Sequence, residues 1–316
     1  MELSSRSERL MGTTITVSIF HPQAEQILAQ CFEQLRLYEH RFSANDATSE
    51  LMEVNHQAGI APVSVHPDLF ELIALGTQHS QATNSHLNIA IGPLVQTWRI
   101  GFSDAKRPSQ EEIDQALSKI DPKQIQLNTK KQSVFLKRLG MKIDLGALAK
   151  GYSADLIATF LKSQGVEDAL IDLGGNILTV GQHPLKHQPW RIGIQNPVEK
   201  RGQHLLVLSV KDKSVVTSGI YERHLEVDGQ SFHHIFDSTT GYPVETDLAS
   251  ITILSDRSVD GEIWTTRLFG EAPASILNIV ESLPGIDAIL VSQSGKIAYT
   301  SGLPSYLQLA IRKEFP

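Results

Sequence analysis

The segments that favour strands and those that favour helices are grouped along this chain, and this grouping limits the fold more than any other feature. Four short β-rich runs follow one another in the second half, separated by Gly, Pro or charged turns, at residues 190–194, 205–210, 224–227 and 250–254. A regular alternation of strand and helix would indicate a doubly wound parallel sheet. The grouping instead predicts an α+β fold with antiparallel sheets and packed helices.

Apolar periodicity and turn residues place the remaining elements. A β-branched run at 13–20 and an apolar run at 168–173 predict strands, and two β-rich runs between 124 and 143 predict a hairpin. A helix is predicted to open at Ser109 and Glu112, which have the spacing of a capping box. Further helices are predicted at 23–41, 67–79, 147–163, 259–269 and 273–283.

The composition allows a substantial hydrophobic core and excludes several classes of protein. With 316 residues, 41% of them hydrophobic, the chain is long enough for a single domain over residues 1–316 that is built from two structural halves. The formal charge of −7 and the lack of a Lys/Arg run argue against a nucleic-acid or anionic-membrane binder. Cys31 stands alone at helical spacing from Leu28 and Leu35, so it is predicted to pack in the core.

The start of the sequence gives an expectation about location. The first nine residues are polar and charged, and they lack the apolar run of a signal peptide and a Cys for lipidation. No other stretch is long and apolar enough to span a bilayer. We therefore expect a cytoplasmic protein without a membrane anchor, provided that no leader precedes this sequence.

Small residues surround two charged ones at a predicted strand-to-helix junction. Asp144 and Lys150 stand where backbone amides at the start of a helix favour phosphate, although Asp144 is equally interpreted as an ordinary helix cap. Two further clusters are Asp172–Asn176, with paired glycines, and Thr217–Arg223, with hydroxyls and a flexible glycine. Alone, these two are typical of structural turns and loops.

Two clusters in the last third of the chain carry groups suited to phosphate chemistry. A Gly-x-Pro turn after Asp237 would hold it in fixed relation to His234, which could stabilise phosphate charge or move a proton. Because neighbouring side chains on a strand point to opposite faces, at most one of His233 and His234 faces a site, and the other is expected on the surface. Glu262 and Thr266 share a helix face and carry oxygens that suit magnesium, although a solvated helix face is the plainer interpretation.

Taken in order, these clusters resemble the FAD:protein FMN transferase family, or ApbE-like flavin transferases, from Met11 to about Val291. The motifs that carry the resemblance are Met-Gly-Thr, Arg-Phe-Ser, Ser-Glu-Leu, Asp-Leu-Gly-x-x-Ala-Lys-Gly-Tyr-x-x-Asp, Gly-Gly, Thr-Ser-Gly-x-Tyr and His-Ile-x-Asp-x-x-Thr-Gly-x-Pro. They begin at residues 11, 41, 49, 144, 174, 217 and 234. Together they are highly specific for this family.

The resemblance implies T-fold-like α+β elements, with an FAD site where two halves of the chain meet. It implies magnesium bound by the backbone carbonyl of Ala147 and by the side chains of Glu262 and Thr266. It also implies cofactor contacts from a larger set: Met11, Asn45, His86, Leu87, Asn88, Asp144, Lys150 and Ile235. His234 would face the pyrophosphate, and the catalytic base would be His234 or Asp237.

The implied reaction is a magnesium-dependent cleavage of FAD. FMN is transferred as a phosphoester to a Thr or Ser of an acceptor protein, and AMP is released. Negative charge develops on both phosphates, and a bridging divalent ion stabilises it. The resemblance therefore implies Mg²⁺ as cofactor, FAD as substrate and a protein carrying a Thr/Ser flavinylation segment as partner.

Four positions depart from the family pattern, and they are concentrated where ligand contacts are expected. Glu262 replaces the metal-binding Asp and is longer by one methylene. In an alternative register Asp260 fills that role, but Trp264 then stands where Thr belongs, so Glu262 is preferred. Asn176 replaces the Asp that follows the Gly-Gly turn.

Other departures affect the expected flavin contacts. Leu87–Ala90 replaces Phe-Asp-x-Thr, which puts Asn88 in place of a carboxylate, and Asn45 stands where an aromatic is usual. These changes leave two rival functions open. One is an FAD-binding protein whose degraded metal site no longer supports transfer. The other is a magnesium-dependent FAD pyrophosphatase that passes FMN to water.

Overall fold

The structure is a computed structural model that describes residues 2–307 except 198 and 201. Its centre is an eight-stranded sheet in the order β1-β2-β6-β7-β10-β13-β14-β15, with antiparallel neighbours throughout. These strands are β1 Ser4–Leu10, β2 Thr13–Ile19, β6 Ala169–Leu173, β7 Ile177–Val180, β10 Ser214–Gly219, β13 Leu248–Ser255, β14 Asp287–Ser292 and β15 Ile297–Tyr299. The predicted α+β class with antiparallel sheets is confirmed.

Smaller sheets and helices complete the described part of the chain. One small sheet joins β3 (Val63–Ser64), β5 (Ser133–Leu136) and β4 (Ile125–Asn128), and two hairpins pair β8 (Trp190–Gln195) with β9 (His204–Val210) and β11 (His224–Val227) with β12 (Gln230–His233). The α-helices are α1 Ala24–Phe42, α2 Glu50–His56, α3 Pro67–Ser80, α4 Gly92–Trp98, α5 Gln110–Leu117, α6 Ala149–Ser163, α7 Ser258–Leu268 and α8 Pro273–Glu281. Short 3-10 turns span Pro122–Gln124 and Leu303–Ser305.

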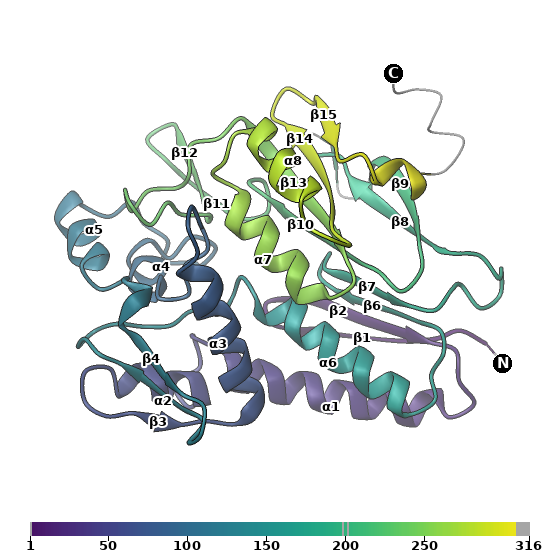
Figure 1. Ribbon diagram of the computed structural model, residues 1–316, viewed down its shortest axis with the longest axis horizontal. Helices are drawn as coiled ribbons and strands as arrows, with labels where there is room; N and C mark the ends of the chain where they lie inside the picture. Colours follow the sequence, from purple (N-terminus) through teal and green to yellow (C-terminus); the bar gives the residue numbers. More distant parts are fainter. Residues whose placement is uncertain (1, 198, 201, 308–316) are drawn as a thin grey trace.

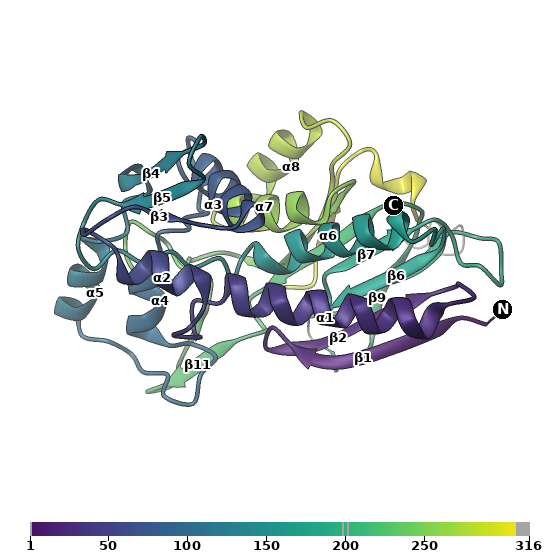
Figure 2. The same cartoon turned by 90° about the horizontal axis from the view of Figure 1, so that it is seen from below.

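Helices α1, α6, α7 and α8 cover one face of the large sheet, and the β8–β9 hairpin packs on the other (Figures 1 and 2). The alternation of side chains along β13 explains these two layers. Ile251 and Ile253 point to the helices, whereas Leu254 joins the core beneath the hairpin. The sheet is therefore buried on both faces in its central part, and α6 and α7 lie side by side on it.

Most predicted elements are present within a few residues of the predicted bounds. Ser109 and Glu112 form the predicted capping box of α5, and β4 and β5 form the predicted hairpin. Cys31 is fully buried, as expected of a packing residue. No helix in the described part of the chain is long and apolar enough to cross a membrane. The assignment of one domain built from two halves stays a prediction.

Several strands were not predicted, among them β1 and β10. The segment of β1 has no apolar alternation, because Arg6 and Glu8 occupy the face toward α1, where Arg36 pairs with Glu8 over 2.7 Å and Arg6 lies over the Phe32 ring. The loop expected at residues 217–219 is the end of β10, a central strand that pairs with β13. Both strands form because the neighbouring strand supplies the hydrogen bonds, whatever the polarity of their side chains.

Candidate functional site

The site is built where α6 and α7 approach each other closely. Gly151 makes this approach possible, since a Cβ at this position would lie 2.7 Å from Glu262 Cγ and 2.7 Å from the Ser258 carbonyl oxygen. Lys150 therefore reaches across the helix interface, and its Nζ lies 3.0 Å from Glu262 Oε1. Two residues that are 112 positions apart in sequence form one ion pair.

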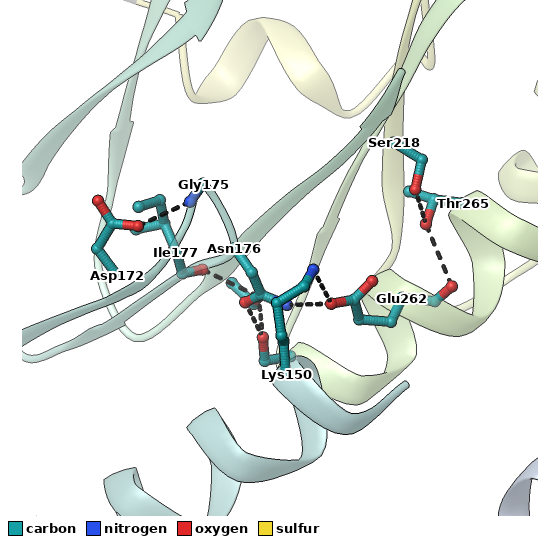
Figure 3. Close-up of polar contacts among 10 residues, drawn as sticks. Lys150, Asp172, Gly175, Asn176, Ile177, Ser218, Glu262 and Thr265 are labelled. Atoms are coloured by element: carbon teal, nitrogen blue, oxygen red, sulfur yellow. Dashed lines mark hydrogen bonds and ion pairs between the residues drawn. The ribbon is translucent and has the colours of Figure 1, made fainter. Parts of the chain in front are cut away.

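The Glu262 carboxylate is the centre of a buried hydrogen-bond network (Figure 3). Asn176, at the start of β7, donates from Nδ2 to Glu262 Oε1 over 2.8 Å, and its Oδ1 accepts from Ser258 Oγ over 2.6 Å. Ser258 in turn lies 3.0 Å from Ser214 Oγ on β10. Asn176 and Glu262 are only 2% and 4% exposed, so the network satisfies polar groups that water does not reach.

The start of α7 is fixed by a carboxylate from α6. The two Asp155 oxygens accept from the backbone amides of Ser258 and Val259, over 2.7 and 2.9 Å. These amides have no partner within the helix, so Asp155 serves as the cap that α7 lacks at its own N-cap residue. Burial raises the pKa of Asp155 to about 6.

The positions along α7 bear on which acidic residue is the metal ligand. Glu262 faces α6, whereas Asp260 lies beside the charges of Arg257 and Asp256, and Trp264 packs under the Arg267 guanidinium. These placements support the register that uses Glu262 and Thr266. The assignment itself stays a prediction.

The neighbouring threonines of α7 have different surroundings. Thr265 is fully buried, and its hydroxyl accepts from Ser218 Oγ over 2.9 Å and donates to the Glu262 carbonyl. Thr266 is half-buried, and its hydroxyl makes no hydrogen bond to any described residue. Of these two threonines, Thr266 alone therefore has a hydroxyl that is free to bind a ligand.

The oxygens of this region suit a hard divalent cation. Among the described residues, the Ala147 carbonyl accepts no hydrogen bond, and Glu262 Oε2 has none either. Thr266 stands one turn after Glu262 on α7, and Ala147 stands two residues before α6; carbonyl, hydroxyl and carboxylate oxygens are the ligands that Mg²⁺ prefers. No three His, Cys, Asp or Glu side chains gather at one point in residues 2–307, the two gaps excepted. A metal here would thus depend on carbonyl and hydroxyl oxygens as well as on one carboxylate.

Asp144 lies in the turn that precedes α6. Its Oδ1 accepts from the Gly146 amide over 2.8 Å, and its own amide donates to the Ile89 carbonyl over 2.9 Å. The helix-cap interpretation is wrong, because α6 begins only at Ala149, its N-cap residue is Leu148, and no side chain caps it. Burial raises the pKa of Asp144, although the Arg223 charge and the Gly146 hydrogen bond act against this rise.

Gly174 and Gly175 lie in the turn between β6 and β7, and Gly174 lets this turn pack against the start of β2. Gly174 has φ +70°, and a Cβ there would lie 2.2 Å from Thr13 Oγ1. The turn at Met11, which leads into β2, consequently packs directly on the β6–β7 turn. The structural interpretation of the glycines is correct, and this same turn delivers Asn176 to Glu262.

His234 follows β12 and lies close enough to Arg223 and Lys150 for their charges to act on it. Its Nδ1 lies 3.3 Å from the Arg223 carbonyl oxygen, and since a carbonyl only accepts, Nδ1 carries the proton and Nε2 is left as an acceptor. Burial, together with the charges of Arg223 and Lys150, lowers the pKa of His234 to about 4. His234 is therefore neutral at pH 7 and able to accept a proton at Nε2.

His233 is not the surface residue that was expected. It is half-buried, its Nδ1 accepts from the Ile235 amide over 3.2 Å, and its Nε2 lies 2.9 Å from the Val244 carbonyl oxygen. Both ring nitrogens are thus used to fix the segment before the Gly-x-Pro turn. The difference arises because β12 ends at His233, so the alternation of a regular strand does not continue to His234.

The Asp237 carboxylate is engaged in its own turn. Its Oδ1 accepts from the amide and from the hydroxyl of Thr239, both over 2.7 Å. Burial raises the pKa of Asp237, but these hydrogen bonds hold this pKa below its usual range. Asp237 is therefore a weaker base than a free carboxylate, and its contacts favour a positioning role in the turn.

The remaining predicted cofactor residues lie in three places. Asn88 is buried, donating to the Ile120 carbonyl over 2.8 Å and accepting from the Ala90 amide over 2.9 Å, and Leu87 is buried in the main core. His86 is half-buried, with Nε2 3.9 Å from Glu271 Oε1. Asn45 is exposed on the loop after α1, and Ile235 packs beside the α7–α8 core.

These placements limit what each of those residues can offer to a ligand. The Ile89–Asp144 contact brings the segment of Asn88 beside the start of α6, in agreement with a shared site. The Asn88 amide donates to the Ile120 carbonyl. An ionised Asp at this position could not make this bond, because a carboxylate only accepts hydrogen bonds. Leu87 can meet a ligand only through its backbone, since its side chain is in the core.

Three residues of the region were not predicted as site residues. Asn176 was recognised only as a departure from the family pattern and Asp155 only as part of a motif, and nothing in their spacing indicated that they contact α7. Arg223 lies with its guanidinium 3.6 Å from where a Gly12 Cβ would stand, and its charge affects both Asp144 and His234. Its position two residues after the Thr-Ser-Gly-x-Tyr motif was the one available signal.

Residues 11–290 match the model of the ApbE family, and the chain belongs to this family. The resemblance read from the sequence motifs is confirmed.

Curated relatives and solved structures agree with this assignment. An FAD:protein FMN transferase of Klebsiella pneumoniae (strain 342) is 39% identical over 94% of this chain and 92% of its own length. One of Treponema pallidum (strain Nichols) is 35% identical over 95% of this chain and 87% of its own length. The crystal structure of the ApbE protein from Thermotoga maritima has a TM-score of 0.89 at 24% identity, covering 97% of this chain and all of that one, and supports the fold.

Proposed function

We propose that this protein is an FAD:protein FMN transferase, which cleaves FAD and attaches FMN to an acceptor protein. The names of its relatives support the reaction class. The observation that carries the proposal is the Lys150–Glu262 ion pair, which joins the motif at the start of α6 to the expected metal-binding carboxylate of α7. Glu262 thus keeps a buried carboxylate at the expected metal position, which argues against a degraded binding protein.

The residues of this chain have distinct parts in the proposed reaction. An acceptor hydroxyl of Thr or Ser attacks the phosphorus of the FMN half, the bond to the bridging pyrophosphate oxygen breaks, and AMP leaves. The neutral His234 takes the hydroxyl proton at Nε2. Lys150 would bind the phosphates, since its charge acts on His234, and Arg223 lies close enough for its charge to act on both Asp144 and His234.

Mg²⁺ would be held by the Ala147 carbonyl, Glu262 and Thr266, and when bound it stabilises the negative charge that develops on the phosphates. The flavin contacts from Met11, Asn45, His86–Asn88 and Ile235, and the Thr/Ser character of the acceptor segment, belong to this proposal. A cytoplasmic location stays a prediction from the sequence.

The test is a mass measurement on an acceptor. The purified protein is incubated with FAD, Mg²⁺ and an acceptor domain that carries a Thr-containing flavinylation segment, with the Thr→Ala acceptor as the matched control. We expect the acceptor to gain the mass of one FMN residue, with an equal amount of AMP released, only when Mg²⁺ is present.

Each other outcome points to a rival function. Free FMN and AMP formed without any acceptor would indicate a pyrophosphatase. FAD that stays bound and intact, while another family member modifies the same acceptor, would indicate a binding protein. Either result would overturn the transferase proposal.

A further inference from the structure

Two positions that depart from the family pattern are in direct contact. Asn176 and Glu262 are 86 positions apart in the sequence, yet the amide nitrogen of one lies 2.8 Å from a carboxylate oxygen of the other. The family pattern has Asp at both positions, and both residues are almost fully buried here. Two changes at touching positions suggest that one compensates for the other.

Charge explains why the two changes belong together. Glu262 is one methylene longer than Asp, and its Oε1 reaches the group at position 176. If that group were a carboxylate, two buried negative oxygens would be in contact without a proton between them, which is strongly unfavourable. The amide of Asn176 removes the like charge and supplies a donor in its place.

The orientation of the Asn176 amide is fixed by its other partner. Ser258 Oγ donates to Oδ1 over 2.6 Å, so Nδ2 points at Glu262. A flipped amide would put its oxygen against the carboxylate, which also only accepts. Ser258 is itself held, because its backbone amide is bound by Asp155.

The two Glu262 oxygens are consequently unequal. Oε1 accepts from both Asn176 Nδ2 and Lys150 Nζ, whereas no described residue donates to Oε2. A glutamate has one more rotatable bond than an aspartate, and this freedom opposes the strict octahedral geometry of Mg²⁺. Two donors on Oε1 remove that freedom and leave Oε2 as the available oxygen.

We propose that Asn176 is a positioning residue that allows Glu262 to replace aspartate as the metal-binding carboxylate. Asn176 and Lys150 anchor Oε1, and Oε2 alone is presented to Mg²⁺. The inference rests on the proposed function, since it assumes that the site binds Mg²⁺. Partners that orient a metal ligand in this way are expected to matter for metal affinity almost as much as the ligand itself.

The first test is a double-mutant cycle on stability without metal. Asn176→Asp, Glu262→Asp and the double variant are unfolded in a chelating buffer, and the urea midpoints are compared. Each single change is expected to lower the midpoint, Asn176→Asp by placing two carboxylates in contact and Glu262→Asp by withdrawing the acceptor from both donors. The double variant is expected to recover much of the loss, because two short carboxylates no longer touch.

The second test repeats the cycle with Mg²⁺ and measures the metal dissociation constant by calorimetry. Each single change is expected to weaken Mg²⁺ binding by about tenfold, the usual effect of losing a partner that orients a ligand. The Mg²⁺ dissociation constant of the double variant should lie within about threefold of that of the natural chain. The effects of the two changes are then not additive, as is typical of residues in contact. Asn128→Asp, the same change at the exposed end of β4, is the control and should alter neither quantity.

The outcomes separate this inference from the proposed function. If Mg²⁺ binds the natural chain but the two changes act additively, or if Asn176→Asp binds Mg²⁺ more tightly, the inference is overturned and the transferase proposal stands. If Mg²⁺ does not bind even the natural chain, the metal part of the proposed function fails and the inference fails with it. Should Asn176→Asp not fold, Asn176→Ala, which removes the donor without adding charge, replaces it in both cycles.

Discussion

The Lys150–Asn176–Glu262 network and the His234–Asp237 segment are two parts of one candidate site, but they are held in different ways. In the first, hydrogen bonds join residues 86 and 112 positions apart. In the second, His234 and Asp237 bond to residues 11 and 2 positions away. Changes in the network should therefore affect the fold and the chemistry together, whereas changes in the histidine segment should affect the chemistry alone.

The largest expected effect tests the histidine segment. We expect His234→Gln to lower the rate of flavin transfer by roughly 10²–10⁴-fold, the usual contribution of a general base, with the melting temperature almost unchanged. The same change at His233 is the matched control and should give the opposite result. Its ring nitrogens are both bonded, so His233→Gln should cost about 1–3 kcal/mol of stability. A loss of stability in His234→Gln would contradict the expectation that changes in the histidine segment affect the chemistry alone.

The next effect concerns the carboxylate that caps α7. The folded-state pKa of Asp155, about 6, lies above its ordinary value of 3.8. Its contribution to stability is therefore complete below pH 4 and is lost as the pH rises to 6. The difference corresponds to about 3 kcal/mol, since one pKa unit is worth about 1.4 kcal/mol. Urea unfolding from pH 4 to 7 should show this fall in the natural chain and lack it in Asp155→Asn, whereas identical profiles would contradict the assignment.

A smaller effect on stability tests the network itself. Glu262→Ala leaves the buried Asn176 amide without its acceptor, which should cost about 1–3 kcal/mol. Chemical denaturation measures this cost, and Mg²⁺ should no longer raise the stability of the variant. Glu33→Ala, on the exposed face of α1, is the control and should change stability by less than about 0.5 kcal/mol. Equal effects in the two variants would show that Glu262 is not part of a network.

The smallest effect is expected at Asp237. Asp237→Asn keeps the oxygen that accepts from Thr239, and the carboxylate is already a weak base. We expect the transfer rate to fall by less than about tenfold, well below the effect of a lost general base. Steady-state kinetics at pH 7 gives the comparison, and a loss as large as that of His234→Gln would make Asp237 the base instead.

Sequence patterns predicted the elements that have a clear periodicity of their own. The amphipathic α1 and the capping box of α5 carry local signals, and both formed as predicted. Strands β1 and β10 were missed because their side chains show no clear apolar alternation. The hydrogen bonds of β1 come from β2, directly across the turn at Met11 and Gly12, whereas those of β10 come from β13, far away in the sequence. A strand that is fixed by its pairing and not by an apolar pattern of its own is not visible in the local sequence.

The site was predictable as a set of motifs but not as a set of contacts. The motifs identified Glu262 and Lys150 separately, whereas their ion pair depends on the close approach of two helices at Gly151. Asn176 was recognised as a departure, but its role became visible only when the β6–β7 turn was seen to deliver it to α7. The same holds for Asp155, whose partner amides belong to α7.

The two edges of the large sheet affect how an extended acceptor segment would meet this protein. One edge is β1, with charged side chains turned toward α1, and the other is β15, only three residues long. Such edges are poor templates for another strand. Capture of a peptide by strand addition is thus disfavoured at both ends of the sheet. Recognition of an acceptor would then rely on side-chain contacts and loops near the site, so its sequence can vary where an added strand would demand a regular pattern.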